Sequence, residues 1–383
     1  MIRRWPLVLV VWGLATAASA KAQAAGNQVP DPAAVRAAIS AGLEYLVANQ
    51  NEDGSWGGVR NATFTTSFGN SGTQYCWMVG TTALATQAVL ELARDEAGRE
   101  AADRGLTYLM LNTRLVRPAE WDVDNIWSLI YGLNTLCAAL QHPRYRGGDQ
   151  EANLRAAAEK LLDGLKRYQS PRGGWGYYAN PGSGWRPDWA TSFTTAACVL
   201  ALLEARAAGL AVDDKMFRAA VRAVERAHLA NGAYNYDVSA VPRHFRMESI
   251  NQVKGSLGRI QVGNLALYKA GGELEEGALL WGVEQFFQHH KFLDAARNKP
   301  IPHEAYYANA AYFYLFGHYY AARVIEELPG ESRARFEGLL QRELLKCRQK
   351  DGSLWDFWLA GNTKPYGTAF GIMALSRTVT PAE

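Results

Sequence analysis

The sequence has few cysteines, and none of them lies at a spacing that binds a metal or forms a redox pair. Cys76, Cys137, Cys198 and Cys347 are the four cysteines, and no two of them show the C-x₂-C spacing of zinc and thiol–disulfide sites. The first three lie within apolar stretches, where free cysteine behaves as a small hydrophobic residue. We therefore expect buried thiols rather than disulfides.

An excess of charge of one sign is also absent. Lys and Arg number 40 against 37 Asp and Glu, so the formal net charge is +3. It falls to +1 if Arg3 and Arg4 are removed with an N-terminal leader. Nucleic acids and anionic membrane surfaces bind to clustered basic faces. We expect neither of them as a partner.

The N-terminus carries the one apolar run of note. Arg3 and Arg4 precede an apolar stretch over about 5–17, which ends at the small residues Ala18-Ser19-Ala20. This order is typical of a cleaved secretory signal, and the stretch is shorter than the roughly 20 residues of a membrane-spanning helix. The sequence predicts a signal peptide over 1–20, a linker over 21–32, and export to the periplasm or exterior. A retained anchor is the alternative.

Signatures of cofactor and nucleophile chemistry are missing as well. The sequence contains no Gly-rich phosphate loop and no G-x-S-x-G elbow. His289, His290, His303 and His318 do not lie at ligand spacing from acidic or sulfur partners. His318 stands in an aromatic stretch, where we expect a hydrogen-bonded core or cavity histidine. We predict no metal and no cofactor.

A repeated loop is the strongest positive signal. Residues 50–56 and 169–175 both read Q-x₃-G-x-W, residues 228–234 form a degenerate copy that ends in Tyr234, and residues 349–355 have the glycine one place early. The aromatic positions are separated by 119, 59 and 121 residues. A unit of about 60 residues fits all three intervals and gives six units, two of which have lost the motif. A fixed period indicates a repeat architecture.

Each unit contains two expected helices of different character. The first are amphipathic and are expected at about 33–49, 96–112, 148–168, 213–229, 274–292 and 331–347. The second are poorer in charge and are expected at about 74–93, 123–141, 191–208, 247–270, 303–327 and 366–377. Half-polar helices belong outside and apolar helices inside. The alternation predicts one all-α domain over 33–383, a double-walled (α/α)₆ toroid.

The glycine and the aromatic residue of the loop have expected structural roles. A glycine after a helix end adopts the left-handed conformation that satisfies the last carbonyls. The tryptophans Trp56, Trp175 and Trp355 are then expected to bury their rings against the neighbouring repeat. We therefore assign these tryptophans to the fold and not to a site.

The Q-x₃-G-x-W loops between amphipathic helices resemble the QW repeats of squalene and oxidosqualene cyclases and the repeats of protein prenyltransferase β-subunits. The resemblance covers almost the whole mature chain. It implies the α/α toroid of the terpenoid cyclase and protein prenyltransferase superfamily, which hosts more than one activity. The zinc site of the prenyltransferases takes an Asp and a Cys two residues apart, and no D-x-C occurs here.

The connections from first to second helices are long and would all emerge at one end of such a barrel. They combine aromatic residues with acids, and function concentrates on long loops over a rigid scaffold. We expect an isoprenoid-like or carbohydrate small-molecule ligand at this end. The predicted ligand-binding residues are Trp121, Trp127, Trp185, Asp188, Trp189, Tyr236, Asp237, His303, Glu304, Tyr307, Asp356 and Trp358.

The segment Asp122-Val123-Asp124-Asn125 resembles the D-x-D-D acid motif of class II terpene cyclases. By that resemblance Asp124 holds the position of the protonating acid, with Asp122 beside it. The fourth position departs from the motif, because residue 125 is Asn and not Asp. The alternative is an N-cap, because a carboxylate before a helix accepts its free amide protons. We expect Asp122 to be the cap and Asp124 to face the cavity.

Four hypotheses for the function follow. The first is an exported binding protein for an apolar or aromatic-stacking ligand, without a complete catalytic motif. The second is a class II cyclase-like isomerase that uses Asp124 as general acid. The third is a carbohydrate-active toroid enzyme, which needs two carboxylates about 5–10 Å apart. The fourth is a protein-binding scaffold.

Overall fold

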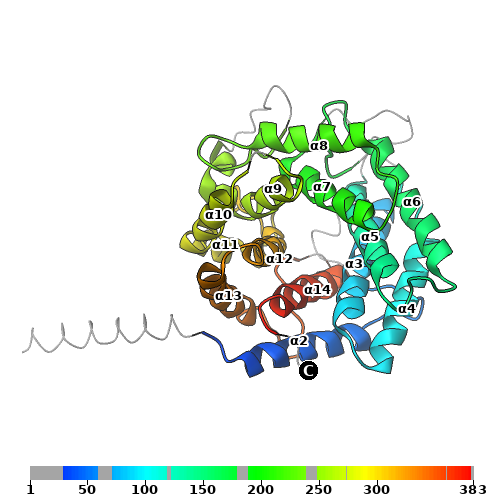
Figure 1. Ribbon diagram of the computed structural model, residues 1–383. Coiled ribbons are helices and arrows are strands. Elements are labelled where there is room, and N and C mark those ends of the chain that lie inside the picture. Colours follow the sequence, from blue (N-terminus) through cyan, green and yellow to red (C-terminus); the bar gives the residue numbers. More distant parts are fainter. Residues whose placement is uncertain are drawn as a thin grey trace, which may run out of the picture.

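The chain folds into two concentric rings of helices in a computed structural model (Figure 1). The structure describes residues 29–58, 71–118, 122–178, 189–238, 248–272, 274–358 and 360–380. The outer ring is α2 (Pro32–Ala48), α4 (Glu96–Leu111), α6 (Glu151–Tyr168), α8 (Asp214–Ala227), α10 (Glu276–Gln288) with α11 (Lys291–Ala296), and α13 (Gly330–Leu345). The inner ring is α3 (Ser71–Leu92), α5 (Asn125–Gln141), α7 (Ser192–Ala207), α9 (Leu257–Lys269), α12 (Phe313–Ile325) and α14 (Thr363–Ser376). The predicted (α/α)₆ toroid is confirmed.

The two rings differ in how much of each helix is buried, as the sequence pattern predicts. On α8 the apolar side chains of Met216, Phe217 and Val224 are buried, while Lys215 and Arg218 are exposed. On α7 nearly every side chain is buried. A helix with one apolar stripe must lie at the surface, and a helix apolar nearly all round must lie inside.

Two inner helices begin about ten residues later than the sequence pattern predicts. We expected helices from 247 and from 303, and α9 begins at Leu257 and α12 at Phe313. Short 3₁₀ turns precede them, at Glu248–Asn251, Val253–Gly255 and Tyr306–Ala308. Tyr307 and Ala308 have φ values of 58° and 53°, which an L-residue cannot keep within a right-handed helix.

The glycine of the repeated loop lies where a side chain cannot fit. Gly54, Gly173 and Gly352 have φ values of 86°, 96° and 84°. A Cβ there would lie 2.4, 2.3 and 2.5 Å from a backbone carbonyl oxygen of the next outer helix. Those carbonyls belong to Arg104 on α4, Ala219 on α8 and Ala41 on α2. The loop of each of these units therefore rests on the outer helix of the following unit.

The loop tryptophans anchor the fold, with one correction to the predicted register. Trp56 and Trp175 are fully buried, and their indole N–H groups donate to the carbonyls of Leu46 and Leu165 at 2.7 and 2.8 Å. In the last copy the equivalent residue is Leu354, not Trp355. The three backbone N–H groups at this loop position donate to threonine hydroxyls of the next inner helix, at Thr82, Thr195 and Thr368 respectively.

The ring is closed. Gly352 of the last unit contacts α2 of the first unit through the same kind of contact that joins neighbouring units. Helix α14 packs against α2 and α3, where Gly42 lies against Ile372 and Thr368. The predicted proximity of the first and last units is confirmed.

Other predictions about the chain stand as follows. All four cysteines are free and buried, as expected. Within the described residues, no helix is both long and apolar enough to cross a lipid bilayer. The expected signal peptide over 1–20 lies outside the described residues, and export stays a prediction.

Candidate functional site

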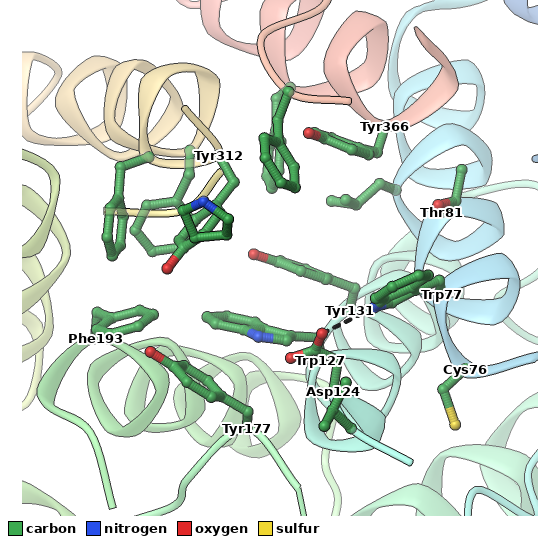
Figure 2. Close-up of a pocket in the computed structure, with 18 of the residues that line it drawn as sticks. Cys76, Trp77, Thr81, Asp124, Trp127, Tyr131, Tyr177, Phe193, Tyr312 and Tyr366 are labelled. Carbon is green, nitrogen blue, oxygen red and sulfur yellow. Dashed lines mark hydrogen bonds between the residues drawn. The ribbon is translucent and has the colours of Figure 1, made fainter. Parts of the chain in front are cut away.

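A cavity of about 540 Å³ lies inside the inner ring, toward the N-terminal ends of the inner helices. Its wall is formed mainly by aromatic side chains from α3, α5, α7, α12 and α14 (Figure 2). Trp127 is central to this wall. Its ring stacks on Tyr131 and Phe193, with 5.7 and 5.9 Å between ring centres, and packs edge-on against Phe316, with 5.9 Å between ring centres. The volume is in the range of small-molecule sites. Among the described residues, the wall holds a single carboxyl group, that of Asp124.

Asp124 points into the cavity from the residue before α5 (Figure 2). Its backbone is left-handed, with φ of 64°, and its side chain makes no capping bond to α5. The alternative of an N-cap is therefore wrong for this residue. Instead, the indole N–H of Trp77 on α3 donates to its Oδ2 at 2.9 Å. Burial raises the pKa of Asp124 to about 6, against the lowering effect of that hydrogen bond.

Asp122 is a cap, but of a different helix from the one predicted. Its Oδ1 accepts the backbone N–H of Thr73 at 2.7 Å and the Thr73 hydroxyl at 3.1 Å. Thr73 lies in the first turn of α3, so Asp122 satisfies free donors of the preceding inner helix. Asp122 is buried and does not reach the cavity wall.

Asp356, four repeat units after Asp122, caps an inner helix in the same way. It accepts the backbone N–H of Leu315 in the first turn of α12 at 2.8 Å and the hydroxyl of Tyr366 at 2.7 Å. The side chain is fully buried, and burial raises its pKa to about 6. Asp356 therefore contacts the cavity only indirectly, through Tyr366.

His303 lines the cavity and is held by three hydrogen bonds. Its Nδ1 lies 2.7 Å from the carbonyl oxygen of Ala308, and its Nε2 lies 2.9 Å from the hydroxyl of Tyr312 and 3.4 Å from that of Tyr236. Burial lowers the pKa of His303, and the positive charge of Arg259 adds to this. The ring is thus a neutral imidazole at pH 7.

The structure separates the predicted catalytic and ligand-binding residues into two groups. Asp124, Trp127, Tyr236 and His303 line the cavity. The others with described positions lie away from its wall. Trp189 packs on Tyr177 and Tyr178, Tyr307 packs on Phe292, and Asp237 pairs with Thr191 in a β-bridge. Glu304 and Trp358 are exposed, and Asp356 is the cap described above. Trp121, Trp185 and Asp188 lie outside the described residues.

Several cavity residues were absent from the predicted set. Most of them are large aromatic residues. Trp77, Tyr131, Phe193, Phe313, Phe316, Tyr366 and Phe370 lie on inner helices, and Tyr177, Tyr312 and Phe357 lie in the segments that precede such helices. In the sequence they read as core, because inner helices are apolar nearly all round. The recurrence of a large aromatic residue near the start of five inner helices is the signal that identifies them.

A second group of titratable side chains lies apart from the cavity. His290 Nδ1 is 3.1 Å from Asp294 and 3.7 Å from Glu343, and His290 Nε2 is 3.0 Å from Nε2 of buried His318. The prediction that the histidines do not lie at ligand spacing from acidic partners is wrong for His290, whereas His318 is the hydrogen-bonded core histidine expected. Lys346 pairs with the same Glu343 oxygen at 2.6 Å. The positive charge of Lys346 disfavours a metal ion between His290, Asp294 and Glu343, the three potential ligands.

Comparisons by sequence find no match: no protein-family model and no curated protein matches the chain. Comparisons by structure find, among other matches, terpene cyclases and carbohydrate-active enzymes. A variant of the type II terpene cyclase MstE from Scytonema, in complex with its substrate geranylgeranyl dihydroxybenzoate, has a TM-score of 0.53 and 13% identity. That match covers 91% of this chain and 97% of the cyclase.

The other class acts on carbohydrates. Unsaturated glucuronyl hydrolase from Bacillus sp. GL1 has a TM-score of 0.60 and 12% identity, covering 90% of this chain and 96% of that enzyme. The GH76A α-1,6-mannanase from Salegentibacter sp. HEL1_6 has a TM-score of 0.59 and 12% identity, covering 89% and 98%. Likeness at this identity concerns the fold, and function has to be argued from the site. The chain has the α/α-toroid fold that terpenoid cyclases share with these glycosidases.

Proposed function

We propose that the protein is a class II terpene cyclase-like isomerase in which Asp124 protonates an alkene or epoxide of an isoprenoid substrate. One observation carries the proposal: the carboxyl group of Asp124 projects into an aromatic cavity, and burial raises its pKa to about 6. An apolar substrate that fills the cavity displaces water, which raises this pKa further and favours the protonated acid.

The rest of the wall suits the intermediate that protonation creates. Transfer of the Asp124 proton to a double bond forms a C–H bond and leaves a carbocation, which the remaining double bonds attack to close rings. Faces of aromatic rings attract a cation, and the rings of Trp127, Tyr131, Phe193 and Phe316 line the cavity. The Trp77 N–H, 2.9 Å from Oδ2, stabilises the carboxylate left behind. Because this donor lies on α3, the Asp124 carboxylate is stabilised without a carboxyl group at position 125.

The same wall argues against glycoside hydrolysis. That reaction uses two carboxyl groups that flank the scissile bond, and the described wall has one. Asp122 and Asp356 are engaged with backbone amides of α3 and α12, and Glu304 is exposed away from the wall.

The leader-like segment over 1–20 supports a site of action outside the cytoplasm.

The proposal is tested with the mature chain, linear isoprenoids of increasing length and their terminal epoxides, with products identified by mass spectrometry. We expect a cyclic isomer of at least one substrate. The Asp124→Asn variant keeps the shape and removes the acid, so its rate should fall by at least 10²-fold, the usual contribution of general acid catalysis. Glu304→Gln removes an exposed acid outside the cavity wall and should convert substrate at the parent rate.

Two results would contradict the proposal. Equal rates for the parent and Asp124→Asn would exclude Asp124 as the acid. Binding of isoprenoids without conversion by the parent, measured through the fluorescence of the cavity tryptophans, would instead establish a non-catalytic binding protein.

A further inference from the structure

An isomerisation that begins by adding a proton must end by losing one, so a cyclase of this kind needs a proton acceptor as well as Asp124. This inference rests on the proposed function. We propose that Tyr312 and His303 together form that acceptor: the Tyr312 oxygen takes a proton from the final carbocation while its own proton passes to His303 Nε2. Both side chains line the cavity.

The hydrogen bonds of His303 determine which of its nitrogens is basic. The carbonyl oxygen of Ala308, 2.7 Å from Nδ1, can only accept, so Nδ1 carries the hydrogen. Nε2 of the neutral ring therefore has a free electron pair. The Tyr312 hydroxyl lies 2.9 Å from Nε2 and donates to it, whereas Tyr236 is more distant at 3.4 Å. This bond directs the Tyr312 proton at the base. The Tyr236 hydroxyl hydrogen-bonds with the Tyr312 hydroxyl, and the Tyr312 oxygen keeps a second lone pair that can accept the final proton.

Burial, together with one nearby charge, keeps the His303 imidazole neutral before the reaction. Burial lowers the pKa of His303, and the buried guanidinium of Arg259 lowers it further. Arg259 lies behind Tyr236, with its charge 5.3 Å from the centre of that ring. A neutral imidazole is a strong enough base for this step, because a C–H bond beside a carbocation is a far stronger acid than imidazolium. Cys76, which also lines the wall, is held as a thiol because burial raises its pKa to about 12.

The position of the pair separates it from the initiating acid. Asp124 stands at the start of α5 beside α3, while Tyr312 enters the cavity from the start of α12 (Figure 2). The cation moves away from the protonated carbon as rings close. A base across the cavity from Asp124 therefore deprotonates the cation that is present after cyclisation and does not deprotonate the cation formed first.

The backbone holds this arrangement in an unusual conformation. His303, Tyr307 and Ala308 all have positive φ, at 64°, 58° and 53°, a region that non-glycine residues seldom adopt. Strain of this kind persists where the surroundings fix it, and functional sites are where it concentrates. The three residues place the Ala308 carbonyl against Nδ1 and so fix the tautomer that the step needs.

The step balances in atoms and electrons. The C–H bond next to the cationic carbon breaks, and its electron pair becomes the new double bond. The proton joins the Tyr312 oxygen as the Tyr312 O–H proton transfers to Nε2, which yields an imidazolium whose Nδ1–H still donates to Ala308. Water removes that proton after product release and reprotonates Asp124. Substrate and product are isomers, and no oxidant or cofactor is consumed.

The test uses Tyr312→Phe and His303→Asn in deuterated water, with the product ratio as readout. Both variants retain Asp124, so we expect substrate consumption and incorporation of one deuterium at the protonated carbon to continue. Termination should change: the share of the parent's alkene should fall at least tenfold, in favour of alkenes from other deprotonations and of water-captured alcohols. Tyr306→Phe is the matched control, because Tyr306 is 74% exposed in the same loop and should leave the ratio unchanged.

The outcomes separate the two proposals. Deuterium incorporation with an unchanged product ratio in Tyr312→Phe would overturn the base and leave the role of Asp124 intact. Absence of conversion in the parent would overturn the proposed function itself. If His303→Asn does not fold, Tyr312→Phe, which removes one oxygen atom, decides alone.

Discussion

At the scale of single residues, two buried carboxyl groups show that the same pKa shift can accompany different surroundings. Burial raises the pKa of Asp124 and of Asp356 to about 6. Asp356 accepts a helix amide and a tyrosine hydroxyl and is fully buried, whereas Asp124 accepts an indole N–H and projects into the cavity. A raised pKa marks burial, and access to the cavity distinguishes an acid from a cap.

The sequence could separate these carboxyl groups only in part. The D-x-D pattern and its resemblance to an acid motif were enough to single out Asp124. The caps at Asp122 and Asp356 serve helices that precede them in the chain by one unit. That relation follows from the packing of neighbouring repeats, so no local pattern around either residue shows it.

The raised pKa of Asp124 leads to a prediction about pH. The acid is competent when protonated, so kcat/KM should be constant below pH 6 and fall about tenfold per unit of pH above it. A shift of the break toward higher pH in kcat would show that bound substrate desolvates the carboxyl group further. The profile is measured with the best isoprenoid substrate from pH 5 to 9. A rate that rises through pH 6 would mean that the carboxylate, acting as a base, is the active form.

At the scale of elements, the contrast between amphipathic and apolar helices predicted nearly all of the helix pairs. It failed at the starts of α9 and α12, where 3₁₀ turns and left-handed residues replace the expected first turns. The loop motif was misaligned in its last copy, because Gln349 and Trp355 each lie one residue after the equivalent motif positions. The bond from the Leu354 N–H to Thr368 shows the true register.

This register predicts a difference between two tryptophans of similar sequence context. Trp175 is fully buried and donates to Leu165, so Trp175→Ala should lower the free energy of unfolding by about 3–5 kcal/mol. Trp355 is partly exposed and packs edge-on against exposed Trp358, so Trp355→Ala should cost about 1 kcal/mol or less. Urea denaturation measures both values. Similar losses in the two variants would show that the loop register is wrong.

At the scale of the whole molecule, the cavity is a product of ring closure. Six inner helices bring their first turns to one end, and the aromatic side chains there face a common centre (Figure 2). The sequence predicted the ring and the end at which the cavity lies. It could not assign the wall, because a helix that is apolar all round gives no sign of which side faces the axis.

Closure leads to a last prediction, which concerns two residues 330 positions apart. A Cβ on Gly42 of α2 would lie 2.4 Å from Cγ2 of Ile372 on α14, so Gly42→Ala overpacks the junction between the first and last units. Helix propensity favours alanine over glycine by about 1 kcal/mol, which offsets part of an overpacking cost of about 1–3 kcal/mol. The net effect of the single variant is therefore a poor test. Ile372→Ala removes the clashing methyl group, so the two substitutions should be coupled by about 1–2 kcal/mol in a double-mutant cycle. Urea denaturation of the parent, both single variants and the double variant gives this coupling energy. In an open superhelix residues 42 and 372 would be distant, and their effects would add within about 0.5 kcal/mol.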